Sequence, residues 1–193
     1  ELVVVDINEN GLTELTRTLR SDKNINVPDK YITYPISFNS DIFYKMLNKH
    51  GSFDIVANFA AHKHVRSEKD VFSTEAMIIN NVVDAKRFLD FLEVNKPSHF
   101  FCVSTDKAAN PVNLMGASKK LMENIIMSYS KGFKITTARF ANVAFSNGSL
   151  LDGYIQRLLH RQPISCPSDV KRFFVSPQES GEICLMTCIL GDS

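Results

Sequence analysis

Short apolar segments alternate with segments of helical periodicity along most of the chain. The apolar, β-prone segments are residues 2–6, 31–38, 54–59, 99–104 and 134–140. The helical patterns lie between them, at residues 11–20, 41–49, 74–93 and 115–130. Short strands that are apolar on both faces and separated by helices are typical of a parallel sheet covered on both sides. The pattern therefore predicts an α/β fold with a doubly wound, Rossmann-like parallel sheet.

The pattern changes after residue 145. This last part predicts a helix at 150–160 with Ser149 as its N-cap, a short strand at 171–174, and a final helix after Pro177. We expect residues 1–145 to form an incomplete nucleotide-binding domain. Residues 146–193 would then supply a small C-terminal part of the substrate-binding region.

The composition of the chain argues against two classes of function, nucleic-acid binding and metal binding. The chain has 193 residues, enough for one domain with a sizeable core, and 44% of them are hydrophobic. A net charge of +1 gives no overall field that would attract nucleic acid. The four cysteines show no C-x-x-C spacing, which argues against a metal site, and Cys184 and Cys188 are expected to be buried, reduced thiols.

Hydropathy and the N-terminal residues indicate where in the cell the protein is expected. No window is apolar for long enough to span a membrane, and the N-terminus lacks the layout of a signal peptide. A cytoplasmic protein is therefore expected, or the cytoplasmic domain of a longer membrane-anchored one. Glu1 is followed directly by a strand-like segment, as in a fragment of a longer chain.

The strongest chemical signal is the polar run at the end of strand 99–104. The apolar strand stops at Ser104, and Thr105, Asp106 and Lys107 follow. The carboxyl ends of parallel strands are where open α/β sheets bind ligands. An acid beside an amine can protonate a leaving hydroxyl while its neighbour removes a proton. The alternative, a surface ion pair, fits poorly because apolar residues flank the run.

Two side chains follow on the next predicted helix. Met115 and Lys119 are spaced i, i+4 and therefore share one helix face. Lysine at that position can donate to ribose hydroxyls. A single methionine is more often a core residue.

Asp6 ends the first strand. In nucleotide-binding βαβ units an acid after the second strand accepts hydrogen bonds from the adenine ribose, and its charge favours NAD over NADP. The alternative is an Asp that only forms a turn. A glycine-rich phosphate loop should precede Asp6 by about 20 residues and so would lie before Glu1. None of the eight glycines of the chain replaces it.

Small residues follow strand 54–59. Asn58, Ala60 and Ala61 would allow a flat or charged ligand to approach the backbone closely, and Lys63 and His64 could contact phosphate or sugar. The alternative is a solvated basic turn. A metal site is not expected, because alternate residues at a strand end point in opposite directions.

Together these motifs resemble those of the extended short-chain dehydrogenase/reductases, in the polysaccharide-biosynthesis branch. The motifs are Val5-Asp6, Ala60-Ala61-x-Lys63-His64-Val65, Ser104-Thr105-Asp106-Lys107-Ala108-x-Asn110-Pro111, Met115-Gly116-Ala117-Ser118-Lys119 and Arg139-Phe140-x-Asn142-Val143. Within this branch the chain is similar to nucleotide-sugar 4,6-dehydratases that act on UDP-N-acetylglucosamine. The resemblance covers nearly the whole chain.

The resemblance implies a mechanism. NAD would take hydride from sugar C4 and return it to C6, and the product would be a 4-keto-6-deoxy sugar nucleotide. Asp106 would protonate the leaving C6 hydroxyl, Lys107 would remove the C5 proton, and Thr105 would hold the C4 oxygen. The implied cofactor contacts are Asp6, Asn58, Ala60, Ala61, Asn81, Ser104 and Lys119. The implied substrate contacts are Lys63, His64, Asn142, Ser149 and Arg172.

The chain departs from this pattern at two positions. Met115 stands where the wider superfamily has a tyrosine that serves as base, so the C4 proton must leave by another route, through Thr105 and water. Ser37 stands where relatives often have an Asp that contacts adenine.

Alternatives remain open for function and assembly. They are a nucleotide-sugar epimerase on the same scaffold and a truncated relative without activity. The resemblance also implies a homodimer formed through helices 74–93 and 115–130. Its candidate interface residues, which could equally be ordinary core, are Phe88, Leu89, Leu92, Met122 and Ile126.

Overall fold

The computed structural model describes residues 1–64, 68–166, 168–169 and 171–191. The chain forms two compact units, Glu1–Ser52 and Phe53–Ser193, and each is described by itself. Val65 of the predicted motif lies outside the described residues. The predicted boundary between a nucleotide-binding part, which ends at residue 145, and a substrate-binding part falls within the second unit. This division stays a prediction.

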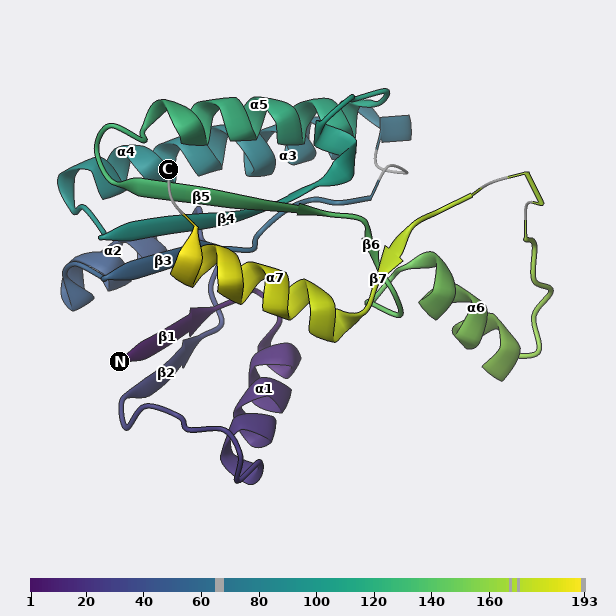
Figure 1. Ribbon diagram of the computed structural model, residues 1–193, viewed down its shortest axis with the longest axis horizontal. Helices are drawn as coiled ribbons and strands as arrows, with labels where there is room; N and C mark the ends of the chain where they lie inside the picture. Colours follow the sequence, from purple (N-terminus) through teal and green to yellow (C-terminus); the bar gives the residue numbers. More distant parts are fainter. Residues whose placement is uncertain (65–67, 167, 170, 192–193) are drawn as a thin grey trace. The chain divides into compact units, whose positions relative to one another are not determined.

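The first unit is a parallel strand pair with two helices. Strand β1 (Leu2–Val5) pairs with β2 (Tyr31–Tyr34), and α1 (Glu9–Ser21) connects them as parallel pairing requires (Figure 1). Helix α2 (Asp41–His50) follows, and Ser40 caps it by accepting a hydrogen bond from the amide of Phe43. The predicted strand over 31–38 is therefore shorter than expected. The unit buries Leu12, Phe43, Met46 and Leu47.

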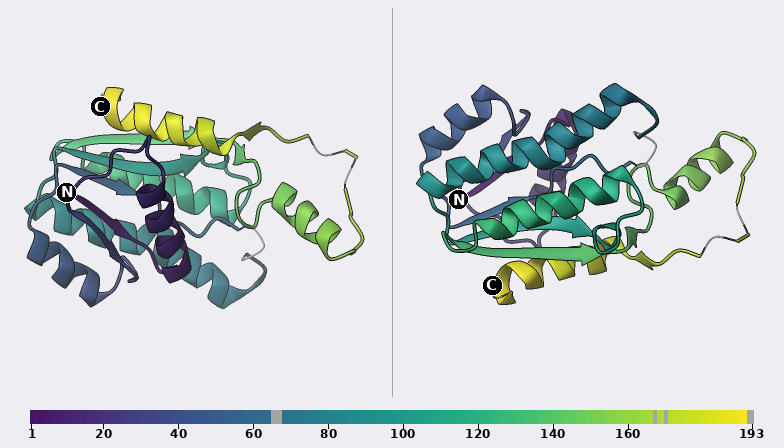
Figure 2. Two further views of the ribbon diagram at one scale, coloured as in Figure 1. Left: turned by 90° about the horizontal axis from the view of Figure 1, so that it is seen from below. Right: turned by 90° about the horizontal axis from the view of Figure 1, so that it is seen from above.

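The second unit is built on a three-stranded parallel sheet. Its strand order is β3 (Ile55–Asn58), β4 (His99–Thr105) and β5 (Lys134–Phe140). The central strand β4 carries Phe100, Phe101 and Cys102, which are 1% exposed or less. Helices α4 (Asp84–Val94) and α5 (Leu114–Ser128) cover one face of the sheet and α7 (Pro177–Leu190) covers the other, as Figures 1 and 2 show. The parallel, two-sided arrangement predicted from the hydrophobic pattern is confirmed.

The helices of this unit follow the predicted pattern with one difference. Their bounds are α3 (Val71–Ile78), α4 (Asp84–Val94), α5 (Leu114–Ser128), α6 (Leu150–Leu159) and α7 (Pro177–Leu190). The single helix predicted over 74–93 is wrong, because a π-helical segment, Ile79–Val83, separates α3 from α4. Such a segment places one extra residue in the turn and re-aims the side chains around it.

The C-terminal part begins with a short parallel strand pair, β6 (Asn142–Val143) and β7 (Phe174–Val175). Ser149 caps α6 as predicted, accepting a hydrogen bond from the amide of Asp152 at 3.3 Å. Helix α7 begins at Pro177 and is capped by a reciprocal pair, Ser176 and Glu179. Within the described residues, no helix is both long enough and apolar enough to cross a membrane.

The residues considered for a dimer interface lie in the core. Each is 5% exposed or less, because the apolar stripes of α4 and α5 are buried within the unit; the residues are Phe88, Leu89, Leu92, Met122 and Ile126. Their core reading is therefore the correct one. Homodimerisation stays a prediction, and it would have to use exposed residues of these helices, such as Leu121 and Met127.

Candidate functional site

A cavity of about 920 Å³ opens at the carboxyl ends of β4 and β5. The loop after β3, the starts of α5 and α6, and the segment before β7 complete its walls. This is the edge of a parallel sheet at which ligand binding is expected. Eleven of the predicted site residues line it: Ala61, Lys63, His64, Ser104, Thr105, Lys107, Met115, Lys119, Asn142, Ser149 and Arg172.

Of the acid–amine pair, the amine of Lys107 lies at the wall of this cavity. Lys107 Nζ donates to Asp106 Oδ1 at 3.2 Å and to Asn142 Oδ1 at 3.2 Å. The Thr105 hydroxyl donates to the same Asp106 oxygen at 2.8 Å. Lys107 and Thr105 line the cavity, whereas Asp106 does not, and its side chain is 49% exposed. The four side chains form one connected cluster.

Electrostatics in the cluster favour an ionised carboxylate. Burial acts to raise the pKa of Asp106, but the hydrogen bond from Thr105 and the ammonium group of Lys107 outweigh it, and the pKa is lowered. Asp106 is therefore a carboxylate at neutral pH in this arrangement.

The backbone after β4 positions the cluster. Strand β4 ends at Thr105, whose hydroxyl accepts from the amide of Lys107 at 3.4 Å, and one turn of 3₁₀ helix, Asp106–Ala108, follows. Helix α5 packs closely against this turn at Gly116, where a Cβ atom would lie 2.7 Å from the carbonyl oxygen of Lys107. Only glycine allows that approach.

Lys119 is a buried amine on the cavity wall. It is 4% exposed, and Nζ donates to the carbonyl oxygen of Val103 at 2.8 Å. Burial lowers the pKa of Lys119, while the nearby Cys102 and Glu123 act in the opposite direction. Met115 shares its helix face and is also 4% exposed, so it is both a core residue and a cavity residue.

The buried carboxylate of Glu123 forms an ion pair with the exposed Arg139. The Glu123 carboxylate accepts a hydrogen bond from Arg139 Nε at 2.8 Å and a second from Nη2. Burial acts to raise the pKa of Glu123, but Arg139 and Ser104 hold it below its usual value. Ser104 Oγ is also buried. It lies near the Glu123 carboxylate but forms no well-aligned hydrogen bond with the described residues. Ser104 thus presents a hydroxyl to the cavity wall.

Four predicted cofactor residues do not line the cavity: Asp6, Asn58, Ala60 and Asn81. Asn58 Oδ1 accepts from the amide of Ala60 at 3.0 Å and so forms the turn after β3. Asn81 bonds both backbone polar groups of His62. Asp6 belongs to the first unit, where Oδ1 accepts from the amide of Asn8 at 2.8 Å, so its role in a turn is present.

One end of the cavity is basic. Arg157, Arg172 and Tyr154 all line this end. A hydrogen bond with Cys166 and burial raise the pKa of Tyr154, and the two arginines act to lower it. Arg157 also donates to the carbonyl of Pro163 at 3.3 Å. Our sequence analysis missed Arg157 and Tyr154. Their i, i+3 spacing places both on one face of the helix that Ser149 caps, but it does not indicate that this face meets the cavity.

The loop after β3 meets the turn before α6 at the cavity. Lys63 Nζ donates to the carbonyl of Asn147 at 3.2 Å. Gly148 has a φ of 71°, and a Cβ atom there would lie 3.1 Å from the ring of His64. The predicted basic turn therefore contacts the segment that leads into α6.

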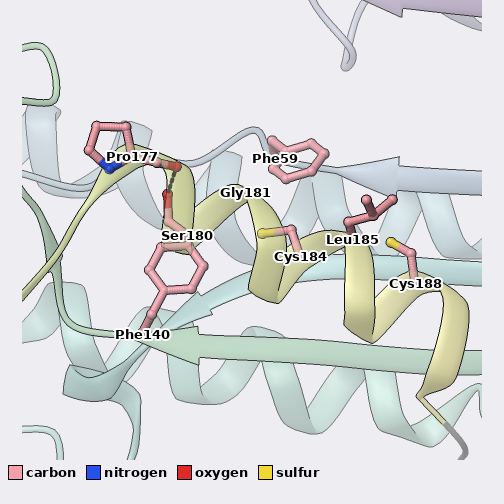
Figure 3. Close-up of a pocket in the computed structure, with 8 residues that line it drawn as sticks. All are labelled: Phe59, Phe140, Pro177, Ser180, Gly181, Cys184, Leu185 and Cys188. Atoms are coloured by element: carbon pink, nitrogen blue, oxygen red, sulfur yellow. Dashed lines mark hydrogen bonds between the residues drawn. The ribbon is translucent and has the colours of Figure 1, made fainter. Parts of the chain in front are cut away.

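A second, apolar pocket of about 390 Å³ lies between α7 and the ends of β3 and β5 (Figure 3). Cys184 and Cys188 lie on its wall, and burial raises the pKa of both thiols, which fits their predicted reduced state. Its only side-chain hydroxyl, that of Ser180, donates to the carbonyl of Pro177 at 2.8 Å. Apart from the two thiols, none of the described residues that line this pocket carries a titratable side chain.

Comparisons with known proteins identify the family of this chain. A family model described as "Polysaccharide biosynthesis protein" matches residues 1–193. An uncharacterized membrane protein of Methanocaldococcus jannaschii is 32% identical over 196 residues, which cover 97% of this chain and 55% of that protein. The chain spans between 21% and 55% of the length of the first curated relatives.

Two solved structures share the fold. A dTDP-glucose 4,6-dehydratase from Streptomyces venezuelae, with NAD and TYD bound, has a TM-score of 0.75 at 14% identity, covering 100% of this chain and 73% of that one. A UDP-glucose 4-epimerase from Thermotoga maritima, with UDP-glucose, has a TM-score of 0.74 at 16% identity, covering 98% and 74%. The match of the family model over the whole sequence shows that this chain belongs to the polysaccharide biosynthesis protein family, a branch of the extended short-chain dehydrogenase/reductases.

Proposed function

We propose that this chain carries the catalytic and substrate-binding residues of a nucleotide-sugar 4,6-dehydratase that acts on UDP-N-acetylglucosamine. The observation that carries the proposal is the hydrogen-bonded cluster of Thr105, Asp106, Lys107 and Asn142, in which every member except Asp106 lines the cavity. Eliminating water across C5 and C6 needs one group that removes a proton and one that supplies a proton, close together. The cluster holds both.

NAD is the proposed cofactor. The residues present fit its nicotinamide end, because the buried Ser104 hydroxyl and the buried Lys119 ammonium are the polar groups that a ribose and a carboxamide need. When bound, NAD would take hydride from C4 of the sugar and return it to C6. Asp6 would accept hydrogen bonds from the adenine ribose, and its charge disfavours the 2′-phosphate of NADP.

The proposed roles of Asp106 and Lys107 require a particular protonation state. Lys107 must be neutral to remove the C5 proton, and Asp106 must be protonated to assist departure of the C6 hydroxyl. Moving the Lys107 ammonium proton to Asp106 along their 3.2 Å hydrogen bond produces this state with no change in total charge. Substrate that covers the pair and excludes water favours the neutral form, because desolvation penalises both charges.

The remaining groups would hold the substrate. Since Met115 cannot ionise, the Thr105 hydroxyl would turn toward the C4 hydroxyl, accept its hydrogen bond and pass its proton to water as the hydride leaves C4. Arg157 and Arg172 at the basic end would bind the diphosphate, for which the guanidinium fork is well suited. Asn142 and Lys63 complete the walls between these two ends.

The test is product analysis with the natural full-length protein. Incubation with UDP-N-acetylglucosamine and NAD should yield a product lighter than the substrate by one water, seen by mass spectrometry. Asp106→Asn with Lys107→Met keeps the size of both side chains and should abolish the product. Unchanged turnover in this double variant would rule out the proposed mechanism.

An epimerase is the second candidate. Its support is the fold shared with UDP-glucose 4-epimerase. Epimerisation leaves the mass unchanged and gives a new sugar nucleotide that chromatography separates. A non-catalytic relative would yield neither product.

A further inference from the structure

We propose that Gly153 is a specificity-determining residue: because it has no side chain, it leaves a recess in the α6 wall of the large cavity, and this recess receives the base of a nucleoside diphosphate. The inference deepens the proposed function and rests on it for the identity of the substrate. The recess itself is a feature of the structure.

Gly153 lies in the middle of the helix stripe that faces the cavity. In α6 this stripe consists of Leu150, Gly153, Tyr154 and Arg157, which all line the cavity. Their i, i+3, i+4 and i+7 positions lie on one face of a helix. Gly153 therefore stands between Leu150, one turn before it, and Arg157, one turn after it. A side chain at position 153 would point into the cavity.

Nothing in the described part of the chain requires a glycine at this position. A Cβ atom on Gly153 would have no neighbouring atom within 4 Å, whereas a Cβ atom on Gly116 would lie 2.7 Å from a backbone carbonyl oxygen. The backbone of Gly153 is helical, and the described glycines with a positive φ are Gly51 and Gly148. Glycine inside a helix lowers its stability relative to alanine. The open space beside Gly153 is therefore left on the cavity side, where a ligand can use it.

The surroundings of the recess fit a base that carries a diphosphate. Leu150 and Phe174 line the cavity and are 45% and 38% exposed, so they offer apolar surface to a flat ring. Arg157 and Arg172 line the same end, and a planar guanidinium group both binds phosphate and stacks on aromatic rings. A base and its diphosphate need apolar surface and cations side by side.

Two hydrogen bonds fix the wall next to the recess. The Tyr154 hydroxyl donates to the carbonyl of Ser165 at 3.2 Å, and Arg157 donates to the carbonyl of Pro163 at 3.3 Å. Ser165 itself lines the cavity. Both side chains are held toward the segment that follows α6, and the space beside Gly153 stays open.

The test measures UDP binding and turnover of UDP-N-acetylglucosamine by the natural full-length protein. Gly153→Leu should fill the recess and still fold, because its Cβ meets open space and leucine is a good helix former. The Kd for UDP, measured by isothermal titration calorimetry, should rise between about 10-fold and about 100-fold. The KM for UDP-N-acetylglucosamine should rise by the same factor while kcat stays unchanged, because the base binds equally in the ground state and the transition state. Gly153→Ala should raise the Kd by only about 3-fold.

Two matched controls separate filling of the recess from a change in helix stability. Gly181→Ala makes the same exchange inside α7, where nothing lies within 4 Å of the Cβ, but Gly181 lines the apolar pocket and not the large cavity. Gln156→Leu adds a leucine to α6 at an exposed position that does not line the cavity. Both glycine-to-alanine variants should raise the Tm by about 2 °C. Both controls should leave the Kd for UDP unchanged.

The inference and the proposed function fail in different ways. A wild-type protein that binds UDP but forms no dehydrated product would contradict the proposed function and leave the inference standing. A wild-type protein that binds no UDP, or a folded Gly153→Leu protein with a normal Kd for UDP, would overturn the inference. A raised KM for UDP-N-acetylglucosamine with unchanged UDP affinity in that variant would place the sugar in the recess, which also overturns it.

Discussion

Lys107 Nζ lies 3.2 Å from Oδ1 of Asn142, although the two residues are 35 positions apart in the chain. This hydrogen bond joins the turn after β4 to the start of β6. Asn142 also donates to the carbonyl of Phe173 at 3.2 Å, so the same side chain ties the catalytic turn to the segment before β7. The amine proposed as the base is thus held by a group from another part of the fold.

Replacing Asn142 should therefore misplace the amine. In Asn142→Ala the Lys107 side chain keeps only Asp106 as a partner, and kcat for UDP-N-acetylglucosamine should fall about 10- to 100-fold. Steady-state kinetics with parallel thermal unfolding would measure this. Asn95→Ala, which removes an amide at the C-terminal end of α4, is the control and should leave kcat unchanged. An unaltered kcat in Asn142→Ala would contradict a role for this bond.

Gly116 should not tolerate a side chain. A Cβ atom would lie 2.7 Å from the Lys107 carbonyl, so Gly116→Ala should lower the free energy of unfolding by about 1–3 kcal/mol and displace the catalytic turn. Gly181→Ala is the matched control, because nothing lies within 4 Å of its Cβ and the helix gains about 0.5–1 kcal/mol. Chemical denaturation of both variants measures the difference, and equal effects would refute the steric argument.

The ion pair between the buried Glu123 and the exposed Arg139 should make stability depend on pH. The folded-state pKa of Glu123 lies below its ordinary value of 4.5, so the pair contributes stability above that pH and loses it as the pH falls through the folded value. Glu123→Gln should be less stable by about 1–3 kcal/mol at neutral pH. Urea unfolding of both proteins between pH 7 and about pH 3 should show the difference shrinking below 4.5. A constant difference would contradict the assignment.

Phe145 should be a site of backbone strain. Its φ is 57°, in the left-handed region that a bulky residue rarely adopts, and its side chain is 59% exposed. Phe145→Gly should therefore raise the free energy of unfolding by about 1 kcal/mol. Phe145→Ala loses the same ring but keeps the strain, so it should show no gain. Thermal unfolding would compare them, and a stabilised alanine variant would point to the ring instead of the backbone.

The hydrophobic pattern predicted most elements because local forces set them. The bounds of β5 are those predicted, and Ser149 caps α6, since a hydroxyl at that position bonds the first turn whatever surrounds it. The π-helical break at Ile79–Val83 was not predicted, because the apolar spacing there fits an uninterrupted helix.

The candidate site was predicted in part. Lys107 was predicted because it follows the end of a buried strand. Lys119 was predicted because it shares a helix face with Met115 in a recognisable motif. Arg157 and Tyr154 were missed, because α6 comes to the cavity only through the β6–β7 pairing and the turn around Gly148. No pattern within α6 records that long-range contact.

The sequence by itself determined the parallel α/β class and the family, because strand and helix periods and short motifs are local properties of the chain. Only the tertiary structure decided which polar groups meet. It buried Lys119 and Asn81, left Asp106 at the edge of the cavity, and brought Asn142 to Lys107. Hydrogen bonds and burial between distant segments depend on packing in three dimensions, which spacing along one chain does not contain.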